Sequence, residues 1–194
     1  MAEGKPLRPA RAALLATAAA AWLWGAPAPA ADPALRLALK QAVEDTASFS
    51  SADQARAWLA RMSRRLRHKI PDPFYRLELL RLVHDEARRA GLEPELVLAL
   101  IEVESGFDRF AISPRGARGL MQVMPFWKKE IGHPRDNLFH PATNLRYGCT
   151  ILKYYLDRTG GDLTRALARY NGSAGRSAYP RLVYAALNRR WRVH

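Results

Sequence analysis

The sequence predicts a mainly α-helical protein, because three observations agree. Apolar residues recur at the 3.6-residue spacing of an amphipathic helix through most of the chain. Proline and glycine stand where helices begin and end, and runs with the period-two alternation typical of strands are scarce. We therefore expect a helical domain of ordinary size, with room for one short β-hairpin in its loop region.

Residues 1–30 have the pattern of a secretory signal peptide. Three basic residues precede an uncharged apolar run at 12–24, and residues 28–30 offer the small side chains that a signal peptidase recognises. We expect cleavage after Ala30 and a periplasmic protein. An uncleaved membrane anchor is the alternative, although the apolar run is short for a bilayer span.

The chain carries an excess of positive charge. Its 31 Lys and Arg residues against 18 Asp and Glu residues give a formal net charge of +13. Removing residues 1–30, which carry three positive charges and one negative charge, leaves +11. Such a balance favours attraction to a polyanion such as nucleic acid, anionic lipid or cell wall. Because arginine and alanine are both abundant, codon bias is an equally good explanation.

Residues 31–73 are expected to form a short helical appendage at the N-terminus. Helices are predicted over 33–49 and 52–68, and Ser51 has a side chain suited to cap the second. Closely spaced prolines end this segment, which places the main domain at 74–194. One face of the second helix is apolar, and its other face is basic and expected to be solvated: Arg56, Arg61, Arg64, Arg65 and Arg67.

The main domain is predicted to be helical nearly throughout. Gly91 stands where a helix commonly ends, and Pro94 stands where the next helix can begin. Residues 109–119 are rich in Pro, Gly, Ser and Arg, which indicates a loop. The predicted helices span residues 74–90, 94–105, 121–131, 142–158, 162–170 and 178–190.

The predicted helix over 94–105 ends close to an unusual carboxylate. It is apolar almost all round, which indicates a buried helix, and Glu104 lies on a stripe with Leu100 and Ile101. Burial and the negative end of the helix dipole both favour the protonated carboxyl group. A carboxylic acid that keeps its proton near neutral pH can act as the general acid that glycosidic bond cleavage requires.

Spacing alone leaves two interpretations of Glu104, because most charged helix residues are solvated. The second interpretation is an ordinary surface residue without a catalytic role. Glu102 lies in line with Glu95 on another part of the helix, and we expect it to be the ordinary exposed carboxylate.

Several motifs that follow Glu104 have a familiar order and spacing. The motifs are Glu104–Phe107, Ser113 with Gly116-Ala117, Gly119–Pro125, Asn144–Gly148 and Ala168–Gly172. Each is weak alone, but together they resemble the catalytic domain of soluble lytic transglycosylases, which is related to goose-type lysozyme. The resemblance covers residues 76–188, and it implies a lysozyme-like α-helical fold.

The resemblance also implies the reaction. Glu104 would be the single catalytic acid and base of a peptidoglycan lytic transglycosylase, which cuts the β-1,4 bond between N-acetylmuramic acid and N-acetylglucosamine. The 6-hydroxyl of the muramic acid attacks its own anomeric carbon, so that no second carboxylate is needed and the product ends in 1,6-anhydromuramic acid.

Five further residues match positions around the sugar cleft of the family. Ser113 and Gln122 would hydrogen-bond the substrate or order water, and Met121 would form a wall of the cleft. The hydroxyl of Tyr170 would orient the acid, and Asn171 would support that corner. Taken singly, each also has a structural reading, as a turn, cap or core residue.

The chain departs from the family pattern at two places. Phe126-Trp127 stands where small or hydroxyl residues are usual, and Arg169 stands where a small or aromatic residue is common. These differences concern the sugar subsites and leave the acid in place. Residues 33–72 lie outside the resemblance.

Three other functions remain open. The first is a hydrolytic muramidase, or lysozyme, on the same fold, and the second is a non-catalytic peptidoglycan-binding assembly protein. The intact set of site residues argues against the second. The third is a nucleic-acid binder, against which the signal peptide and the lack of a recognisable reading module both argue.

The sequence implies no cofactor and no metal. The histidines show no ligand spacing, His84 is expected to be a packed helix residue, and Cys149 is expected to be a small buried hydrophobe. The expected partner is the glycan strand of peptidoglycan, bound by a monomer, and nucleic acid is not expected. Cell-wall or secretion-system assembly proteins are further candidate partners.

Overall fold

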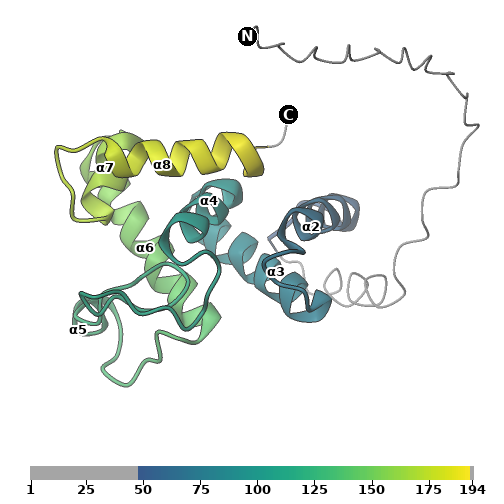
Figure 1. The fold of residues 1–194 in the computed structure, drawn as a ribbon, viewed down its shortest axis with the longest axis horizontal. Coiled ribbons are helices and arrows are strands. Elements are labelled where there is room, and N and C mark those ends of the chain that lie inside the picture. Colours follow the sequence, from purple (N-terminus) through teal and green to yellow (C-terminus); the bar gives the residue numbers. More distant parts are fainter. Residues whose placement is uncertain (1–47, 193–194) are drawn as a thin grey trace, which may run out of the picture. The chain divides into compact units, whose positions relative to one another are not determined.

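The computed structural model describes residues 48–192, and this part of the chain is built from helices (Figure 1). The mainly α prediction is therefore confirmed. Strand pairing in the described part is limited to isolated antiparallel bridges, Ile112 with Arg118 in the predicted loop and Arg118 with Val123 just beyond it. The helices are α2 (Ala52–Leu66), α3 (Pro73–Arg89), α4 (Pro94–Glu104), α5 (Trp127–Ile131), α6 (Pro141–Arg158), α7 (Leu163–Tyr170), α8 (Ala178–Ala186) and the π-helix η1 (Leu187–Trp191).

Helix ends follow from the residues that the sequence places there. The Ser51 side chain accepts a hydrogen bond from the Gln54 backbone N–H at 3.2 Å and so caps α2. Gly91 follows α3 with a φ of 69°, in the left-handed region that glycine adopts without steric cost. Pro94 lies in the first turn of α4, where its missing N–H leaves no hydrogen bond unmade.

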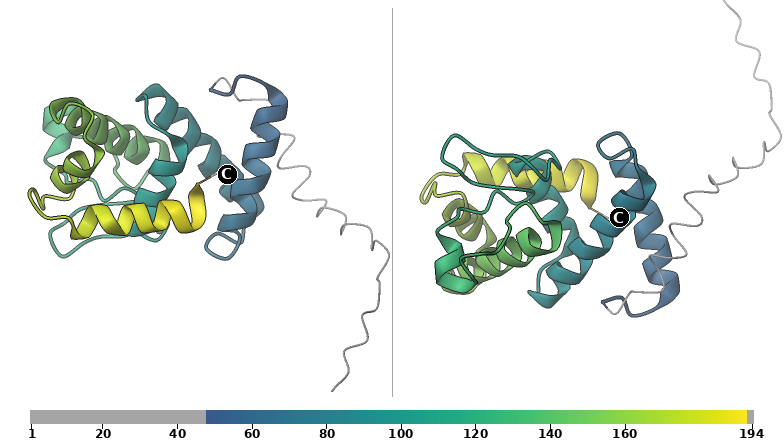
Figure 2. Two further views of the ribbon diagram at one scale, coloured as in Figure 1. Left: turned by 90° about the horizontal axis from the view of Figure 1, so that it is seen from above. Right: turned by 90° about the horizontal axis from the view of Figure 1, so that it is seen from below.

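Helix α4 forms the centre of the core. Its residues from Leu96 to Ile101 are all buried, and α3, α8 and η1 pack against it. Figures 1 and 2 show α4 beside α8 on one side and α3 on the other. The predicted burial of this helix is confirmed, and its C-terminal residue, Glu104, is therefore held by a rigid element.

Helix α2 packs on α3. Its apolar stripe, which includes Met62, is part of the same hydrophobic cluster as the helices that follow. The turn between α2 and α3 is fixed by Arg76, which is buried. Its guanidinium group donates to the Ser63 hydroxyl at 2.8 Å and to the Ile70 carbonyl at 2.6 Å.

The C-terminal segment contacts both α2 and α4. The segment predicted as one helix over 178–190 is α-helical only to Ala186 and then forms the π-helix η1. This change brings the fully buried Trp191 into contact with both α2 and α4. The indole N–H of Trp191 donates to Glu102 at 2.7 Å, and its carbonyl accepts from Arg65 of α2 at 3.0 Å. The Glu102 side chain is only 13% exposed. The prediction of an exposed Glu102 is therefore wrong, and Arg65 of the predicted basic face is half-buried.

The helix predicted over 121–131 begins only at Trp127. The backbone N–H of Met121 is occupied by the side chain of Asn144 at 2.8 Å. Gln122 has a φ of 49°, in the left-handed region, which is incompatible with a right-handed helix. Apolar spacing therefore predicted a helix where tertiary contacts hold a turn.

One buried side chain, Asn144 of α6, organises the loops before and after α5. Its Oδ1 accepts from the Met121 backbone, and its Nδ2 donates to the carbonyls of Arg118 at 2.8 Å and Leu138 at 2.7 Å. Gly119 passes so close that an added Cβ would lie 2.5 Å from the Leu138 carbonyl oxygen. These contacts position the loop that faces the end of α4.

Some predictions fall outside the described residues. The signal peptide at 1–30 does so entirely, and so does the helix predicted over 33–49 except for Ser48 and Phe49, which lie in a turn and a bend. Within residues 48–192, no helix combines the length and the apolar character that crossing a membrane requires.

Candidate active site

Glu104 ends α4 in the surroundings that its apolar stripe predicts. Its carboxyl Oε1 accepts a hydrogen bond from the Tyr179 hydroxyl at 2.5 Å. Burial raises the pKa of Glu104 to about 7, although the hydrogen bond from Tyr179 favours the ionised form and lowers it. Near neutral pH the carboxyl group therefore exists in both forms, and it can donate a proton in one step and accept one in another.

A cleft of about 520 Å³ opens beside Glu104, a size typical of ligand-binding pockets. Its walls come from the end of α4, the loop before α5, and parts of α6 and α7. Of the residues predicted at the site, the structure brings these five to the cleft: Glu104, Ser113, Gln122, Tyr170 and Asn171. The other lining residues are Pro114, Arg115, Ala117, Met124, Phe126, Trp127, Tyr155, Arg169 and Gly172.

Ser113 and Gln122 are both fixed by the loop that carries them. The Ser113 hydroxyl oxygen accepts from the Ala117 backbone N–H at 3.0 Å, which leaves its own hydrogen available to a ligand. The Gln122 amide donates to the carbonyls of Ala111 at 3.2 Å and Gly119 at 2.9 Å. Its left-handed backbone is a strained conformation of the kind that clusters at functional sites.

Two tyrosines lie near the acid, and sequence reasoning named the wrong one as its partner. The Tyr170 hydroxyl donates to the Met121 carbonyl at 2.7 Å, whereas the contact with Glu104 belongs to Tyr179 of α8. Burial raises the pKa of Tyr179 well above its usual value, so that its hydroxyl remains a proton donor. Its only signal in the sequence is an aromatic residue near the start of the last predicted helix.

Met121 lies beneath the cleft and does not line it. Its side chain is fully buried against α6, where an added Cβ at Gly148 would lie 2.3 Å from its sulfur atom. The predicted role of Met121 as a cleft wall is therefore wrong, and the residue fills the core. Met124, three positions later, is the methionine that lines the cleft.

Aromatic side chains line one part of the cleft. Phe126 is 53% exposed, its ring lies 5.1 Å from that of Trp127, and Trp127 lies edge-on to Tyr155 at 6.4 Å. Rings in a ligand cleft offer apolar faces against which sugar rings can pack. The departure from the family pattern at residues 126–127 therefore places aromatic surface in the cleft.

Glu104 is the only carboxylate among the described residues that line the cleft. Asp108, which follows it closely in sequence, accepts from the Phe110 backbone N–H at 2.8 Å and stabilises a turn. Ordinary glycosidases place two carboxyl groups on either side of the scissile bond. Among the described residues, the cleft has one carboxyl group and not the pair of that arrangement.

Replacing Tyr179 with phenylalanine is expected to move the alkaline limb of the pH–rate profile to higher pH. The hydroxyl stabilises ionised Glu104, so its removal raises the pKa of the carboxyl group further. A hydrogen bond to a charged group is worth about 1.5–3 kcal/mol, which corresponds to about one pH unit or more. The measurement is kcat/KM against pH on purified glycan strands.

The matched control for this change is Tyr184→Phe on the same helix. The Tyr184 hydroxyl contacts Thr164 at 3.0 Å and not the acid, so the alkaline limb should stay in place. If Tyr179→Phe lowers the rate without moving that limb, the hydroxyl does not act on the proton affinity of Glu104.

Two titratable residues outside the cleft are packed, as predicted. His84 is 4% exposed, and burial lowers its pKa to about 4, so the ring is neutral at physiological pH. Cys149 is fully buried, and burial raises the pKa of its thiol to about 12. A thiol that keeps its proton is a poor nucleophile, which confirms Cys149 as a small core residue.

Comparison with known proteins places these features in a family. The model of the transglycosylase SLT domain matches residues 81–185. Membrane-bound lytic murein transglycosylase C of Actinobacillus pleuropneumoniae serotype 5b is 36% identical over 50% of this chain and 31% of its own length. The protein of the same name from Yersinia enterocolitica is 35% identical with the same coverage. This chain thus spans about 31% of the length of these curated relatives.

Solved structures of lytic transglycosylases are more distant. An inactive mutant of lytic transglycosylase Slt from Pseudomonas aeruginosa matches 72% of this chain and 30% of its own, with 22% identity and a TM-score of 0.45. The 70 kDa soluble lytic transglycosylase of Escherichia coli matches 79% of this chain and 29% of its own, with 21% identity and a TM-score of 0.43. The family model covers more than half of the chain, including Glu104 and the cleft around it, and the chain therefore belongs to the transglycosylase SLT domain family.

Proposed function

We propose that this chain is a peptidoglycan lytic transglycosylase, which cleaves the β-1,4 bond between N-acetylmuramic acid and N-acetylglucosamine. The observation that carries the proposal is a single carboxyl group, Glu104, with a pKa of about 7 at the edge of an aromatic-lined cleft. The names of the relatives agree with this reaction, since both are lytic murein transglycosylases.

In the first step the protonated Glu104 donates its proton to the glycosidic oxygen that leaves with N-acetylglucosamine. The bond between this oxygen and the anomeric carbon of muramic acid breaks, and positive charge develops on the muramoyl ring. The N-acetyl group of the same ring assists at the anomeric carbon. Tyr179 stabilises the carboxylate that remains, because its hydroxyl already donates to Oε1.

In the second step the ionised Glu104 accepts the proton of the muramoyl 6-hydroxyl, whose oxygen bonds to the anomeric carbon of the same ring. The acid returns to its protonated form, and no water is consumed. A pKa near 7 suits both steps, since the group must be a competent acid and a competent base in one turnover. Ser113 and Gln122 are proposed to hydrogen-bond the sugar, and Asn171 to support the corner beside Tyr170.

Digestion of purified sacculi is expected to release muropeptides that end in 1,6-anhydromuramic acid. Mass spectrometry identifies these ends, because they are lighter than hydrolysed ends by one water and are unchanged by borohydride reduction. Reducing ends that borohydride does reduce would make the enzyme a hydrolytic muramidase with the same acid. No release at all, with binding retained, would make it a peptidoglycan-binding protein.

The next proposal concerns the cellular location and the partners of the chain. We propose that residues 1–30 export the chain and that it acts in the periplasm as a monomer on glycan strands. A net charge of +11 after removal of residues 1–30 favours retention on the anionic cell wall. Cell-wall or secretion-system assembly proteins are proposed as further partners.

A further inference from the structure

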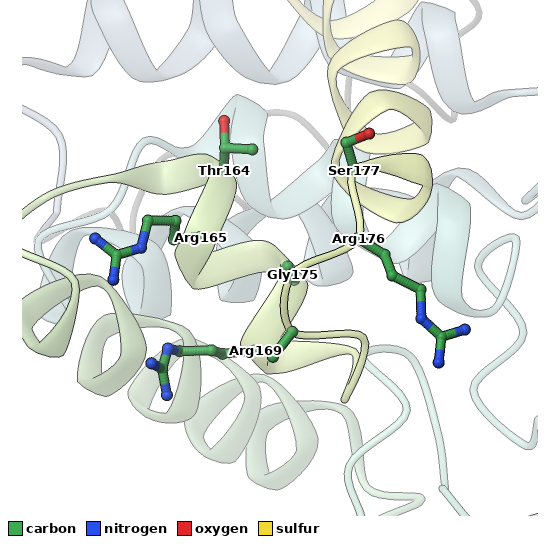
Figure 3. Close-up of a pocket in the computed structure, with 8 residues that line it drawn as sticks. Thr164, Arg165, Arg169, Gly175, Arg176 and Ser177 are labelled. Atoms are coloured by element: carbon green, nitrogen blue, oxygen red, sulfur yellow. The ribbon is translucent and has the colours of Figure 1, made fainter.

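A second cavity, of about 360 Å³, lies where α7, the following loop and the start of α8 meet (Figure 3). Three of the eight residues that line it are arginines: Arg165 and Arg169 come from α7, and Arg176 comes from the loop. Figure 3 shows the first two side chains extending to the same side, while that of Arg176 extends to the other. The three guanidinium groups are exposed and do not converge on one point.

These arginines have no counterion in the described part of the chain. None of the three forms an ion pair there, although other arginines of the protein do, such as Arg146 with Glu86. The nearest acid in sequence, Asp162, caps α7 by accepting from the Arg165 backbone. Two like charges one turn apart on α7 repel each other, so the arrangement favours an anionic ligand over the empty state.

The cavity and the catalytic cleft share one lining residue. Arg169 lines both, and the next residues, from Tyr170 to Gly172, line the cleft. A branch that leaves a glycan strand in the cleft beside Arg169 would therefore lie next to the arginine-lined cavity. Arg169 is also the position where the sequence departs from the family pattern.

The chemistry of the proposed substrate indicates which of its groups the arginines would bind. Sugar hydroxyls and acetamido groups carry no charge, so they leave three guanidinium groups unmatched. The lactyl group of each muramic acid, however, carries a short peptide with more than one carboxylate. Arginine binds carboxylates with two parallel hydrogen bonds, and separated arginines suit separated carboxylates.

We propose that Arg165, Arg169 and Arg176 bind the carboxylates of the peptide stem on the glycan strand that occupies the cleft. This inference rests on the proposed function. It makes the enzyme selective for strands that carry peptides over bare glycan, through a site next to the catalytic cleft. Arg169 is the link between the two cavities.

The test measures binding, so that it does not depend on cleavage. All proteins carry Glu104→Gln to prevent turnover, and isothermal titration gives the Kd for short glycan strands with their peptides and for the same strands after an amidase has removed the peptides. The parent protein is expected to bind the peptide-bearing strands about tenfold more tightly or better. Adding Arg165→Gln with Arg176→Gln should remove most of this preference, with only Arg169 left, and leave the Kd for bare strands unchanged.

The matched control removes two exposed arginines at the end of α2, with Arg64→Gln in its last turn and Arg67→Gln at its C-cap. It makes the same change in net charge at a surface without this cavity, and it should keep the preference for peptides. An equal loss in both double variants would mean general attraction to charge and overturn the proposal. A parent protein without a preference, or a loss on bare strands as large as on peptide-bearing ones, would overturn it as well. An inactive wild type with peptide-selective binding would refute only the catalytic function.

Discussion

Glu104→Gln is expected to lower the release of muropeptides from sacculi by at least about 10²- to 10⁴-fold, the range that general acid catalysis contributes. The amide has nearly the same size and can accept the same hydrogen bond from Tyr179, but it has no proton to transfer. Because no other carboxylate lines the described cleft, no neighbouring acid can replace it. The rate is measured by chromatography of the soluble products.

The same substitution should stabilise the fold at alkaline pH. Burial raises the folded-state pKa of Glu104 from the ordinary 4.5 to about 7, so the native protein binds this proton more tightly than the unfolded chain. The wild type therefore loses stability as the pH rises between those values, by up to about 3 kcal/mol. The glutamine variant avoids this loss, and its Tm should exceed that of wild type at pH 8 and match it below pH 4.5.

Glu93→Gln is the control for both measurements. This side chain precedes α4, is 72% exposed, and should affect neither rate nor Tm. A Glu104→Gln protein that remains active would overturn the assignment of the acid and the family roles with it. A lower Tm at pH 8 would instead mean that the ionised carboxylate stabilises the fold.

The sequence pattern predicted the protonated Glu104 because the residues that bury its carboxyl group lie mostly in the same helix. The buried helix α4 is apolar almost all round, so any carboxylate on its inner stripe is desolvated wherever the helix packs. Caps and breakers such as Ser51 and Gly91 act within one turn of the chain, and the helix ends that they predict are found. Such features need no knowledge of the tertiary structure.

The predictions that proved wrong concern residues whose surroundings come from segments distant in the sequence. Tyr179 reaches Glu104 across 75 positions, and only the packing of α8 on α4 brings them together. The turn at Met121 depends on Asn144, 23 positions later, which captures the backbone N–H that a helix would use. Apolar spacing indicated a buried segment there and could not indicate which partner the backbone would find.

The contact between Glu102 and Trp191 is another that the sequence pattern could not predict, because it joins residues far apart in the chain. Spacing on the isolated helix gave Glu102 a polar position, but the C-terminal segment returns to cover it. The indole of Trp191 and the guanidinium groups of Arg189 and Arg190 then surround its carboxylate. Sequence patterns describe a helix face and not the segment that packs on it.

Trp191→Ala is accordingly expected to destabilise the protein by about 3–5 kcal/mol, the usual cost of truncating a buried tryptophan. The side chain is fully buried, packs 5.6 Å from the ring of Phe107, and donates to Glu102, so its loss leaves both a cavity and a carboxylate without that donor. Urea unfolding measures the free energy. Trp191→Phe keeps most of the packing and should cost less, while Leu182→Ala, at a side chain 58% exposed on α8, should cost about 0.5 kcal/mol or less. Equal values for Trp191→Ala and Leu182→Ala would show that the C-terminal segment does not close the core.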